Sequence, residues 1–299
     1  MAKIKETKLH NNKNLAAIIT TAVICCWCAL LLLMLGWAII SSFKSRPEFS
    51  GLGYYEDVSP LELPQKWLWS NYKDAFEYIS VDVRGAKVKL PGLLMNSAIY
   101  AVGTTLASTI TPMMVAYACA KYKFKLGSFL HSLVLVVMVV PIVGNLSSTI
   151  QVSRDFHLYD NFWGMFFMRA TWTNMYFLIF YTAFKSQPTS YDEAAKIDGA
   201  GPFDLLLKID FPLVSSVFVG VLVIMFMTNW NEYYIPMIYL PSYPVVVYAL
   251  YKMQAYSGTG MTIPILIAGS VIVSLSTLIL FLVFKNRIMG NISIGGIKE

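Results

Sequence analysis

Residues 15–43 read LAAIITTAVICCWCALLLLMLGWAIISSF, a run of 29 positions without a charged side chain. The hydrocarbon core of a bilayer is about 30 Å thick and is crossed by a helix of about 20 apolar residues. A cleaved signal peptide has an apolar region of only about 7–15 residues, followed by a small-residue cleavage site. The run exceeds that length and no such site follows it, so we predict a retained transmembrane helix.

Five further apolar stretches of similar length follow this first helix, whose apolar part we place at residues 15–41. They span residues 92–118, 127–149, 162–184, 213–235 and 263–284. Prolines and glycines inside them are compatible with membrane helices, because neighbouring helices can satisfy the freed backbone groups. The predicted fold class is an all-α integral membrane protein with six transmembrane helices.

The composition agrees with this prediction. Of the 299 residues, 57% are hydrophobic and 13% are charged, whereas a soluble domain has about 25% charged residues. The net charge of +6 suits a membrane protein that holds its loops on the cytoplasmic side. No nucleic-acid-binding motif accompanies it, so the predicted surroundings are membrane lipid and not nucleic acid.

The distribution of lysine and arginine predicts the orientation. If the N-terminus is inside, the cytoplasmic segments hold 13 of these residues in 67 positions, and the outer segments hold 9 in 89. Cytoplasmic loops carry the excess of positive charge, so both termini are predicted to be cytoplasmic. The predicted parts are a tail over 1–14, a first helix over 15–43, an outer loop over 44–91, a transmembrane core over 92–284 and a tail over 285–299.

The cytoplasmic segment between the fourth and fifth helices reads SYDEAAKIDGAGPFDLLLKIDFP over residues 190–212. It predicts two short helices around a bend, with Ser190 as the N-cap of the first. Gly199 and Gly201 are suited to ending that helix and Pro202 to starting the next. Small alanines on such a helix favour close approach by another protein, while an amphipathic connector lying on the membrane remains the alternative.

This segment resembles the EAA loop of type I ABC importer permeases. The pattern is Glu-Ala-Ala, three residues, Gly, nine residues, then Ile-x-Leu-Pro. The matching residues are Glu193, Ala194, Ala195, Gly199, Ile209 and Pro212. The one departure is Phe211 in place of leucine, which exchanges one apolar side chain for another.

The resemblance extends over about residues 65–299 and points to carbohydrate uptake. The pairs Asn71-Tyr72 and Asn96-Ser97, the run Ile197-Asp198-Gly199-Ala200 and the ending Gly295-Gly296-Ile297-Lys298 resemble the permeases related to the maltose system, particularly their six-helix subunit. This resemblance implies half of a pore for a sugar or oligosaccharide, in a multi-pass protein of the bacterial inner or plasma membrane.

The resemblance also implies partners. They are a second permease subunit, two copies of a cytoplasmic ABC ATPase that bind ATP and Mg, and an extracytoplasmic solute-binding protein. Within the coupling loop, residues 185–212, Glu193 would make polar contacts with the ATPase, Ala194 and Ala195 would pack against its groove, and Gly199 would supply the bend. The chain has no G-x-x-x-x-G-K-[ST] motif, so we expect no enzyme activity and no cofactor in this chain.

A polar and aromatic group near the outer end of the fifth helix is a candidate for the substrate path. Its residues are Asn229, Trp230, Asn231, Glu232 and Tyr234. Asn231 and Tyr234 are three positions apart and are expected to share a helix face. Arg169, inside the fourth apolar run, is a second candidate because a charge within the membrane is a functional hypothesis by default. An aromatic interface belt and a snorkelling arginine are the alternatives.

Other functions and residue roles also fit the sequence. The aromatic residues of the outer loop, such as Trp67, Trp69 and Tyr72, suit an interface belt or a docking surface. An importer for a non-sugar solute fits the same loop motif. A membrane enzyme would need an acid–base pair, and Glu232 and Asp160 have no convincing partners. A channel or secondary transporter would need midplane charges beyond Arg169. No metal site is predicted, and Cys25 and Cys28 form an isolated pair.

Overall fold

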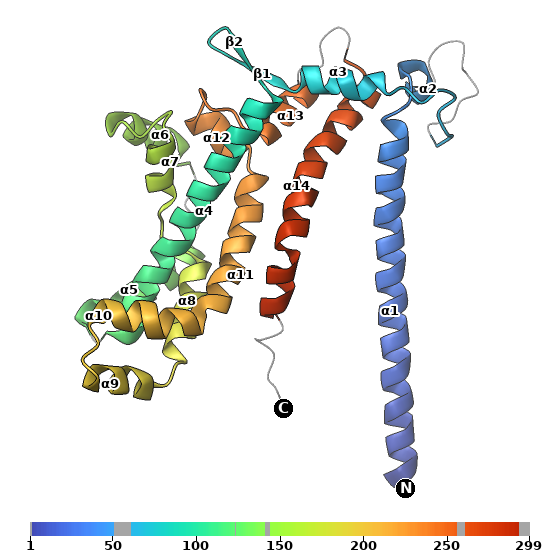
Figure 1. Ribbon diagram of the computed structural model, residues 1–299. Coiled ribbons are helices and arrows are strands. Elements are labelled where there is room, and N and C mark those ends of the chain that lie inside the picture. The colour runs from blue at the N-terminus through green and yellow to red at the C-terminus, as the bar shows by residue number, and fades with distance from the viewer. Residues whose placement is uncertain (1, 51–60, 123, 141–143, 256–260, 293–299) are drawn as a thin grey trace. The chain divides into compact units, whose positions relative to one another are not determined.

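The computed structural model describes residues 2–50, 61–122, 124–140, 144–255 and 261–292, most of them helical (Figure 1). The elements are α1 (Ala2–Ser41), α2 (Arg46–Ser50), α3 (Ser70–Tyr78), β1 (Ser80–Val83), β2 (Ala86–Lys89), α4 (Leu90–Lys121), α5 (Lys125–Val139), α6 (Leu146–Asp155), α7 (Phe162–Arg169), α8 (Met175–Lys185), α9 (Thr189–Ile197), α10 (Pro202–Asp204), the π-helical η1 (Leu205–Asp210), α11 (Phe211–Trp230), α12 (Tyr234–Tyr239), α13 (Val246–Ala255) and α14 (Ile263–Ile292). The chain divides into two units, Met1–Tyr78 with Tyr256–Ile272 and Ile79–Ala255 with Val273–Glu299.

Three helices in the described residues are long and apolar enough to cross a membrane. They are Ala17–Ser41, Leu90–Lys121 and the continuous run Pro202–Trp230. Shorter apolar helices are Lys125–Val139, Met175–Lys185 and Ile263–Ile279. The mostly helical fold and the three long spans agree with an integral membrane protein, although the sequence predicts six spans of full length.

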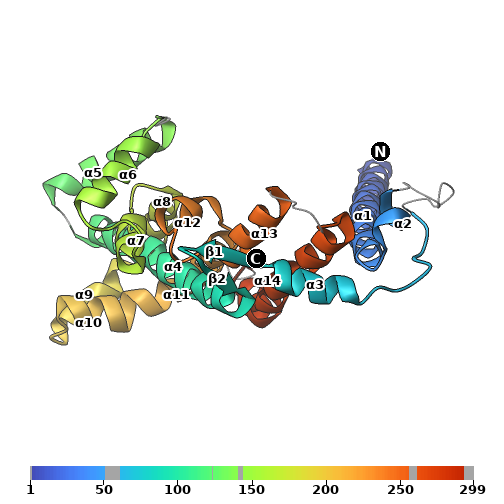
Figure 2. The same cartoon turned by 90° about the horizontal axis from the view of Figure 1, so that it is seen from above.

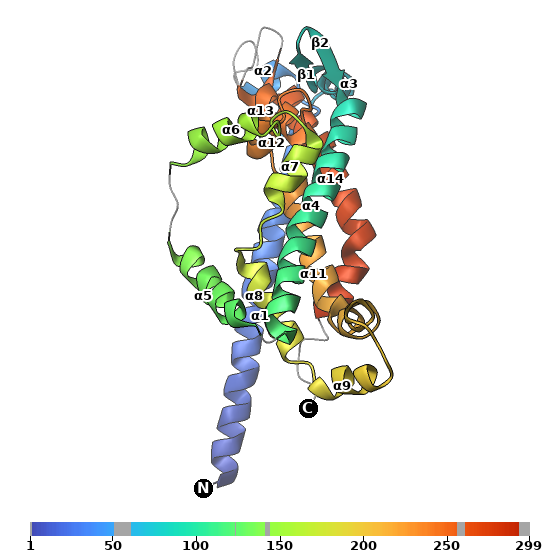
Figure 3. The same cartoon turned by 90° about the vertical axis from the view of Figure 1, so that its left-hand side faces the viewer.

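Three of the six predicted spans are not single helices. The stretch 213–235 runs past the end of α11 at Trp230 to the first residues of α12. The stretch 127–149 is divided between α5 and α6, and the stretch 162–184 between α7 and α8. The division between α7 and α8 has a clear cause, because the Asn174 side chain accepts hydrogen bonds from the backbone N–H groups of Tyr176 at 3.0 Å and Phe177 at 3.3 Å and so begins a new helix. Figure 3 shows α7 and α8 one above the other along α4.

Helix α4 is the centre of the larger unit and contacts α7, α8 and α11. Small and hydroxylated side chains on α4 allow these helices to approach closely. The Ser97, Thr104 and Ser108 hydroxyls donate to carbonyls four residues earlier at 2.6–2.8 Å, so each buried hydroxyl has a partner. The apolar core between α4, α8 and α11 includes Phe177 and Phe180, both fully buried.

A two-stranded antiparallel hairpin departs from the predicted all-α class. Strand β1 pairs with β2, with Val83 opposite Ala86, so only two residues form the turn. Arg84 and Gly85 both have positive φ, 52° and 87°, as expected for the tight turn of a two-residue hairpin. Figure 2 shows the hairpin beside the start of α4, which β2 contacts, while β1 contacts α13.

In the smaller unit, the end of α1 is closed by Asn71 at the start of α3. The Asn71 Nδ2 group donates to the Ser42 carbonyl and the Lys44 carbonyl, each at 2.8 Å. The rings of Trp69 and Tyr72 lie 4.7 Å and 5.0 Å from that of Phe43. The outer-loop aromatic residues therefore form a local cluster around the end of α1, in addition to any belt or docking role.

Replacing Asn71 with leucine is expected to loosen this end of α1. The change leaves two buried carbonyls without their donor, at a cost of about 2 kcal/mol. Hydrogen exchange of the amides of residues 42–44 should accelerate by about tenfold or more. Tyr72→Phe is the matched control, since it removes one hydroxyl bond to Ser42 (2.7 Å) and keeps the ring. Equal exchange rates in the two variants would contradict a special role for Asn71.

Candidate functional site

The predicted coupling loop contains a short helix, α9, with a well-defined end. Gly199 has φ of 83°. Its N–H donates to the Lys196 carbonyl at 3.1 Å, and the Ala200 N–H donates to the Ala195 carbonyl at 2.9 Å. These two bonds are those of a Schellman motif, which requires a left-handed residue that glycine adopts without steric cost. The sequence places the bend at this residue, and the structure does so as well.

The start of α9 differs from the prediction. Ser190 was expected to be the N-cap, but the helix begins at Thr189 after Pro188 and has no side-chain cap. The Pro188 backbone is extended, with φ of −61° and ψ of 130°, so the chain enters the helix one residue after the proline. Ser190 consequently lies within the first turn. Asp192 is also in this turn, where a negative charge interacts favourably with the helix dipole.

Some motif residues on α9 are buried and others are exposed to solvent or to a partner. Ala195 is buried, whereas Glu193 and Ala194 are exposed. Two large apolar side chains are exposed nearby, Ile197 at 86% and Phe203 of α10 at 77%. We call Glu193, Ala194, Ile197 and Phe203 the α9 face. It combines a carboxylate, a small residue and apolar surface, a composition that suits contact with another protein.

The other two motif residues lie where the coupling loop enters the long helix. Ile209 is half-buried in η1, and Pro212 is exposed in the first turn of α11. A proline lacks the N–H that an α-helix uses and its ring crowds the preceding turn. The backbone widens before it into a π-helical turn, in which the Phe211 N–H donates to the Leu206 carbonyl five residues back. Figure 1 shows the helix labelled α10 running sideways from the lower end of α11.

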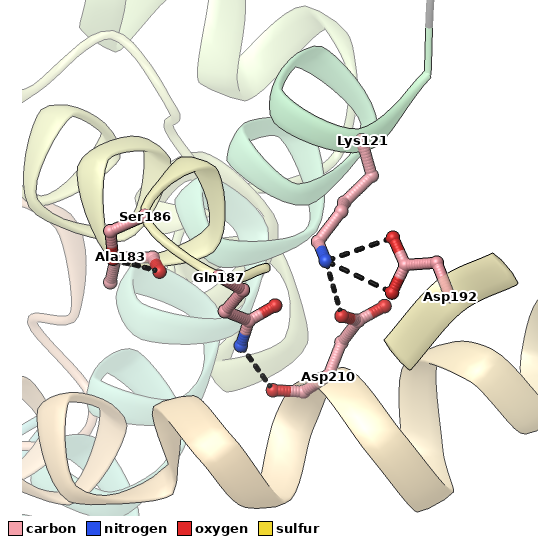
Figure 4. Close-up of polar contacts among 6 residues, drawn as sticks. All are labelled: Lys121, Ala183, Ser186, Gln187, Asp192 and Asp210. Atoms are coloured by element: carbon pink, nitrogen blue, oxygen red, sulfur yellow. Dashed lines mark hydrogen bonds and ion pairs between the residues drawn. The ribbon is translucent and has the colours of Figure 1, made fainter. Parts of the chain in front are cut away.

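A polar cluster holds the coupling loop against the end of α4 (Figure 4). The Lys121 Nζ atom lies 3.1 Å and 3.0 Å from the two carboxylate oxygens of Asp192 and 2.6 Å from Asp210 Oδ1. The Gln187 side chain donates to the Asp210 carbonyl at 3.0 Å. None of these residues is a candidate site residue by sequence alone. Lys121 is one of the positive charges on the predicted cytoplasmic side, and its partners are 71 and more positions away.

The second candidate group is partly brought together. Arg169 Nη2 donates to Asn229 Oδ1 at 3.2 Å, and Asn229 Nδ2 donates to Thr105 Oγ1 at 3.1 Å. Asn229 is 1% exposed, so both ends of its amide are used within the protein. The hydrogen-bonded chain joins α7, α11 and α4. Trp230 is also buried, at 6% exposure.

The remaining members of this group lie around a break in the helix. Asn231 and Tyr234 were expected to share a helix face, but α11 ends at Trp230 and α12 begins at Tyr234. The Asn231 amide donates to the Met227 carbonyl at 2.8 Å, and Glu232 accepts from the Tyr234 N–H at 2.8 Å. These side chains satisfy backbone groups at the two helix ends, which explains the break. Tyr234 is 46% exposed.

Comparison with known proteins relates this arrangement to transport. The sequence profile of the family described as "Binding-protein-dependent transport system inner membrane component" matches residues 93–286. The arabinooligosaccharides transport system permease protein AraQ of Bacillus subtilis is 24% identical over 261 residues, 87% of this chain and 88% of that protein. The sn-glycerol-3-phosphate transport system permease protein UgpE of Escherichia coli is 27% identical over 146 residues, 49% of this chain and 52% of that protein.

A solved structure has a similar fold. It belongs to a bacterial ABC transporter involved in the import of the acidic polysaccharide alginate. The TM-score is 0.71 at 19% identity, over 91% of this chain and 96% of that chain. At this identity the comparison shows the fold alone, which is that of an ABC importer permease.

Proposed function

Since the chain belongs to the family of binding-protein-dependent transport system inner membrane components, we propose that it is the permease subunit of an ABC importer for a sugar or oligosaccharide. In this proposal the chain forms half of the pore with a second permease, and six spans place both termini in the cytoplasm. Two copies of a separate ATPase bind and hydrolyse ATP with Mg. An extracytoplasmic solute-binding protein delivers the substrate to this membrane protein of the bacterial inner or plasma membrane.

The observation that carries the proposal is the α9 face. The Glu-Ala-Ala sequence lies on a short exposed helix, which ends in a Schellman motif and is joined by the Asp192–Lys121 ion pair to α4. The same lysine pairs with Asp210 of η1. Such a helix presents a surface to a partner and is connected to helices of the membrane core. We propose that the ATPase binds the α9 face, with Glu193 making polar contacts and Ala194 allowing close approach.

The substrate path is a further part of the proposal. Arg169, Asn229, Trp230, Asn231, Glu232 and Tyr234 are its candidates. The exposed members, Asn231 and Tyr234, are the ones with surface to offer to a sugar hydroxyl or ring face. Asn229 already uses both ends of its amide, so we propose that it positions Arg169.

The choice of a sugar rests on the relatives. AraQ, by its name, serves an arabinooligosaccharide transport system, and the fold neighbour serves alginate import. The second candidate is a non-sugar solute, which the similarity to the glycerol-3-phosphate permease UgpE favours. Binding of candidate sugars and of glycerol 3-phosphate to the associated solute-binding protein would decide between the two.

Replacing Ala194 with tryptophan tests the docking proposal. Ala194 is exposed, so the larger side chain leaves the packing inside this chain unchanged and blocks a partner on the α9 face. When the chain is purified in nanodiscs with a candidate partner permease and ATPase, retention of the ATPase is expected to fall by about tenfold or more, the effect of losing about 1.4 kcal/mol of binding.

Ala86→Trp is the matched control for this experiment. Ala86 is also exposed but lies on the hairpin, and this variant should retain the ATPase at the wild-type ratio. Failure of the wild type to retain any ATPase, or equal retention by Ala194→Trp and wild type, would rule out docking at the α9 face.

A further inference from the structure

The attachment of α9 to the rest of the protein depends on few contacts. Of its nine residues, all of which the structure describes, Ala195 is the only buried one. An alanine methyl offers little apolar contact area. The ion pairs of Asp192 with Lys121 are therefore a major part of what holds α9 in place.

The lysine that makes these contacts is itself shielded. The side chains of Lys121, Asp192 and Asp210 are 9%, 15% and 2% exposed. One ammonium faces two carboxylates, which come from different helical segments. Without the ammonium the two negative charges would face each other in a site largely removed from water, so the segments would separate or admit water.

Such a cluster is a poor means of stabilising a fold. Desolvation of buried charges offsets most of their attraction, and apolar side chains of similar size often stabilise as well or better. Charged groups do fix one relative position of the segments that carry them, because each ion must keep its partner. The cluster is therefore better suited to keeping α4, α9 and η1 in a defined arrangement than to adding stability.

From this we infer that Lys121 is a positioning residue that transmits movement of α9 to the membrane helices. The inference rests on the proposed function. When the ATPase displaces α9, the Lys121–Asp192 pair moves α4, and the Lys121–Asp210 pair moves η1 and the α11 helix that continues from it. Without Lys121, α9 still binds the ATPase, but it moves without the pore helices.

The test measures ATP-driven movement at the far end of α11. A reporter cysteine replaces exposed Thr228 near the end of α11, and the four native cysteines are changed to serine. The chain is reconstituted with its partner permease and ATPase, and the rate of maleimide labelling is measured with and without Mg-ATP and vanadate. In Lys121→Met the ATP-dependent change in rate is expected to shrink by about fivefold or more, while the amount of bound ATPase stays at the wild-type level.

Two comparison variants separate this inference from the proposed function. Lys125→Met removes a neighbouring exposed charge and should behave as wild type. Ala194→Trp should lose the ATPase itself.

If the reporter chain with Lys121 intact binds no ATPase, the proposed function fails. If it binds ATPase but its labelling does not respond to ATP, or if Lys121→Met responds fully, the inference alone fails. Loss of bound ATPase in a folded Lys121→Met would also overturn it, because the lysine would then serve docking.

A neutral variant covers the case in which Lys121→Met does not fold. Lys121→Met, Asp192→Asn and Asp210→Asn together leave no unpaired charge in the cluster, so this triple variant is expected to fold. It should bind the ATPase and show the same weakened response to ATP. A full wild-type response in the triple variant would overturn the inference.

Discussion

Replacing Gly164 with alanine is expected to destabilise the protein by about 3 kcal/mol, at the upper end of the cost of overpacking. A Cβ atom at this position would lie 2.2 Å from the Leu158 carbonyl oxygen and 2.5 Å from the Leu158 Cα. Both are backbone atoms, so the clash cannot be relieved by a side-chain rotation. The turn that precedes α7 would have to move.

That turn is held in place from several directions. His157 and Asp160, on either side of Leu158, have positive φ of 57° and 55°. The Asp160 carboxylate accepts from the Ser242 N–H at 2.9 Å and from the Ser242 hydroxyl at 2.6 Å, and the Asp160 N–H donates to the Tyr239 carbonyl at 2.8 Å. Movement of Leu158 would disturb these bonds, which join the turn to α12 and its following loop.

Thermal unfolding in detergent, followed by tryptophan fluorescence, measures the effect. Gly220→Ala is the matched control, because the added Cβ in the middle of α11 would have no heavy atom within 4 Å apart from the neighbouring residues and nearby backbone of its own helix. Alanine is the better helix former by about 1 kcal/mol, so this variant should unfold at the wild-type temperature or above it. Similar unfolding temperatures for the two variants would mean that the turn before α7 yields more easily than its hydrogen bonds indicate.

Apolar composition and run length predicted the long helices well, since α1, α4 and α14 contain the expected apolar runs and α11 contains all but the last five residues of its run. They could not predict where an apolar run breaks. Asn174 looks like one polar residue inside a membrane helix, but its side chain starts a new helix by binding two backbone N–H groups. Whether such a residue caps a helix or faces a neighbour depends on tertiary packing, which local propensity does not contain.

The candidate site shows the same division. The bend at Gly199 was readable because a glycine between two short helices has a specific local role. The cluster around Lys121 was not, because Asp192 and Asp210 are distant in sequence and look like ordinary polar residues of a cytoplasmic loop. The family resemblance likewise selects Glu193 and Ala194 of the α9 face and gives no information on the lysine that lies behind it.

Replacing Asn229 with leucine is expected to cost about 3 kcal/mol of stability, because it takes a hydrogen-bond partner from the half-buried Arg169 guanidinium and from the buried Thr105 hydroxyl. Leucine has a similar size, but it removes the acceptor of Arg169 and the donor to Thr105. Arg169→Met should cost less, about 1–2 kcal/mol, because it removes the charge together with its hydrogen bond and leaves only a neutral amide oxygen unpaired. The unfolding temperatures of both variants give the two costs.

The double variant distinguishes a structural role of Asn229 from a direct role in the substrate path. If Asn229 mainly positions Arg169, the leucine costs much less once the arginine is absent, and the two changes fall short of additivity by about 1–2 kcal/mol. If Asn229 contacts substrate and contributes little to the fold, the single variants unfold like the wild type and impair only uptake. Asn231→Leu is the matched control, since Asn231 is exposed and its amide bonds only locally to Met227. Its change should be additive with Arg169→Met in every case, because no shared contact couples the two positions.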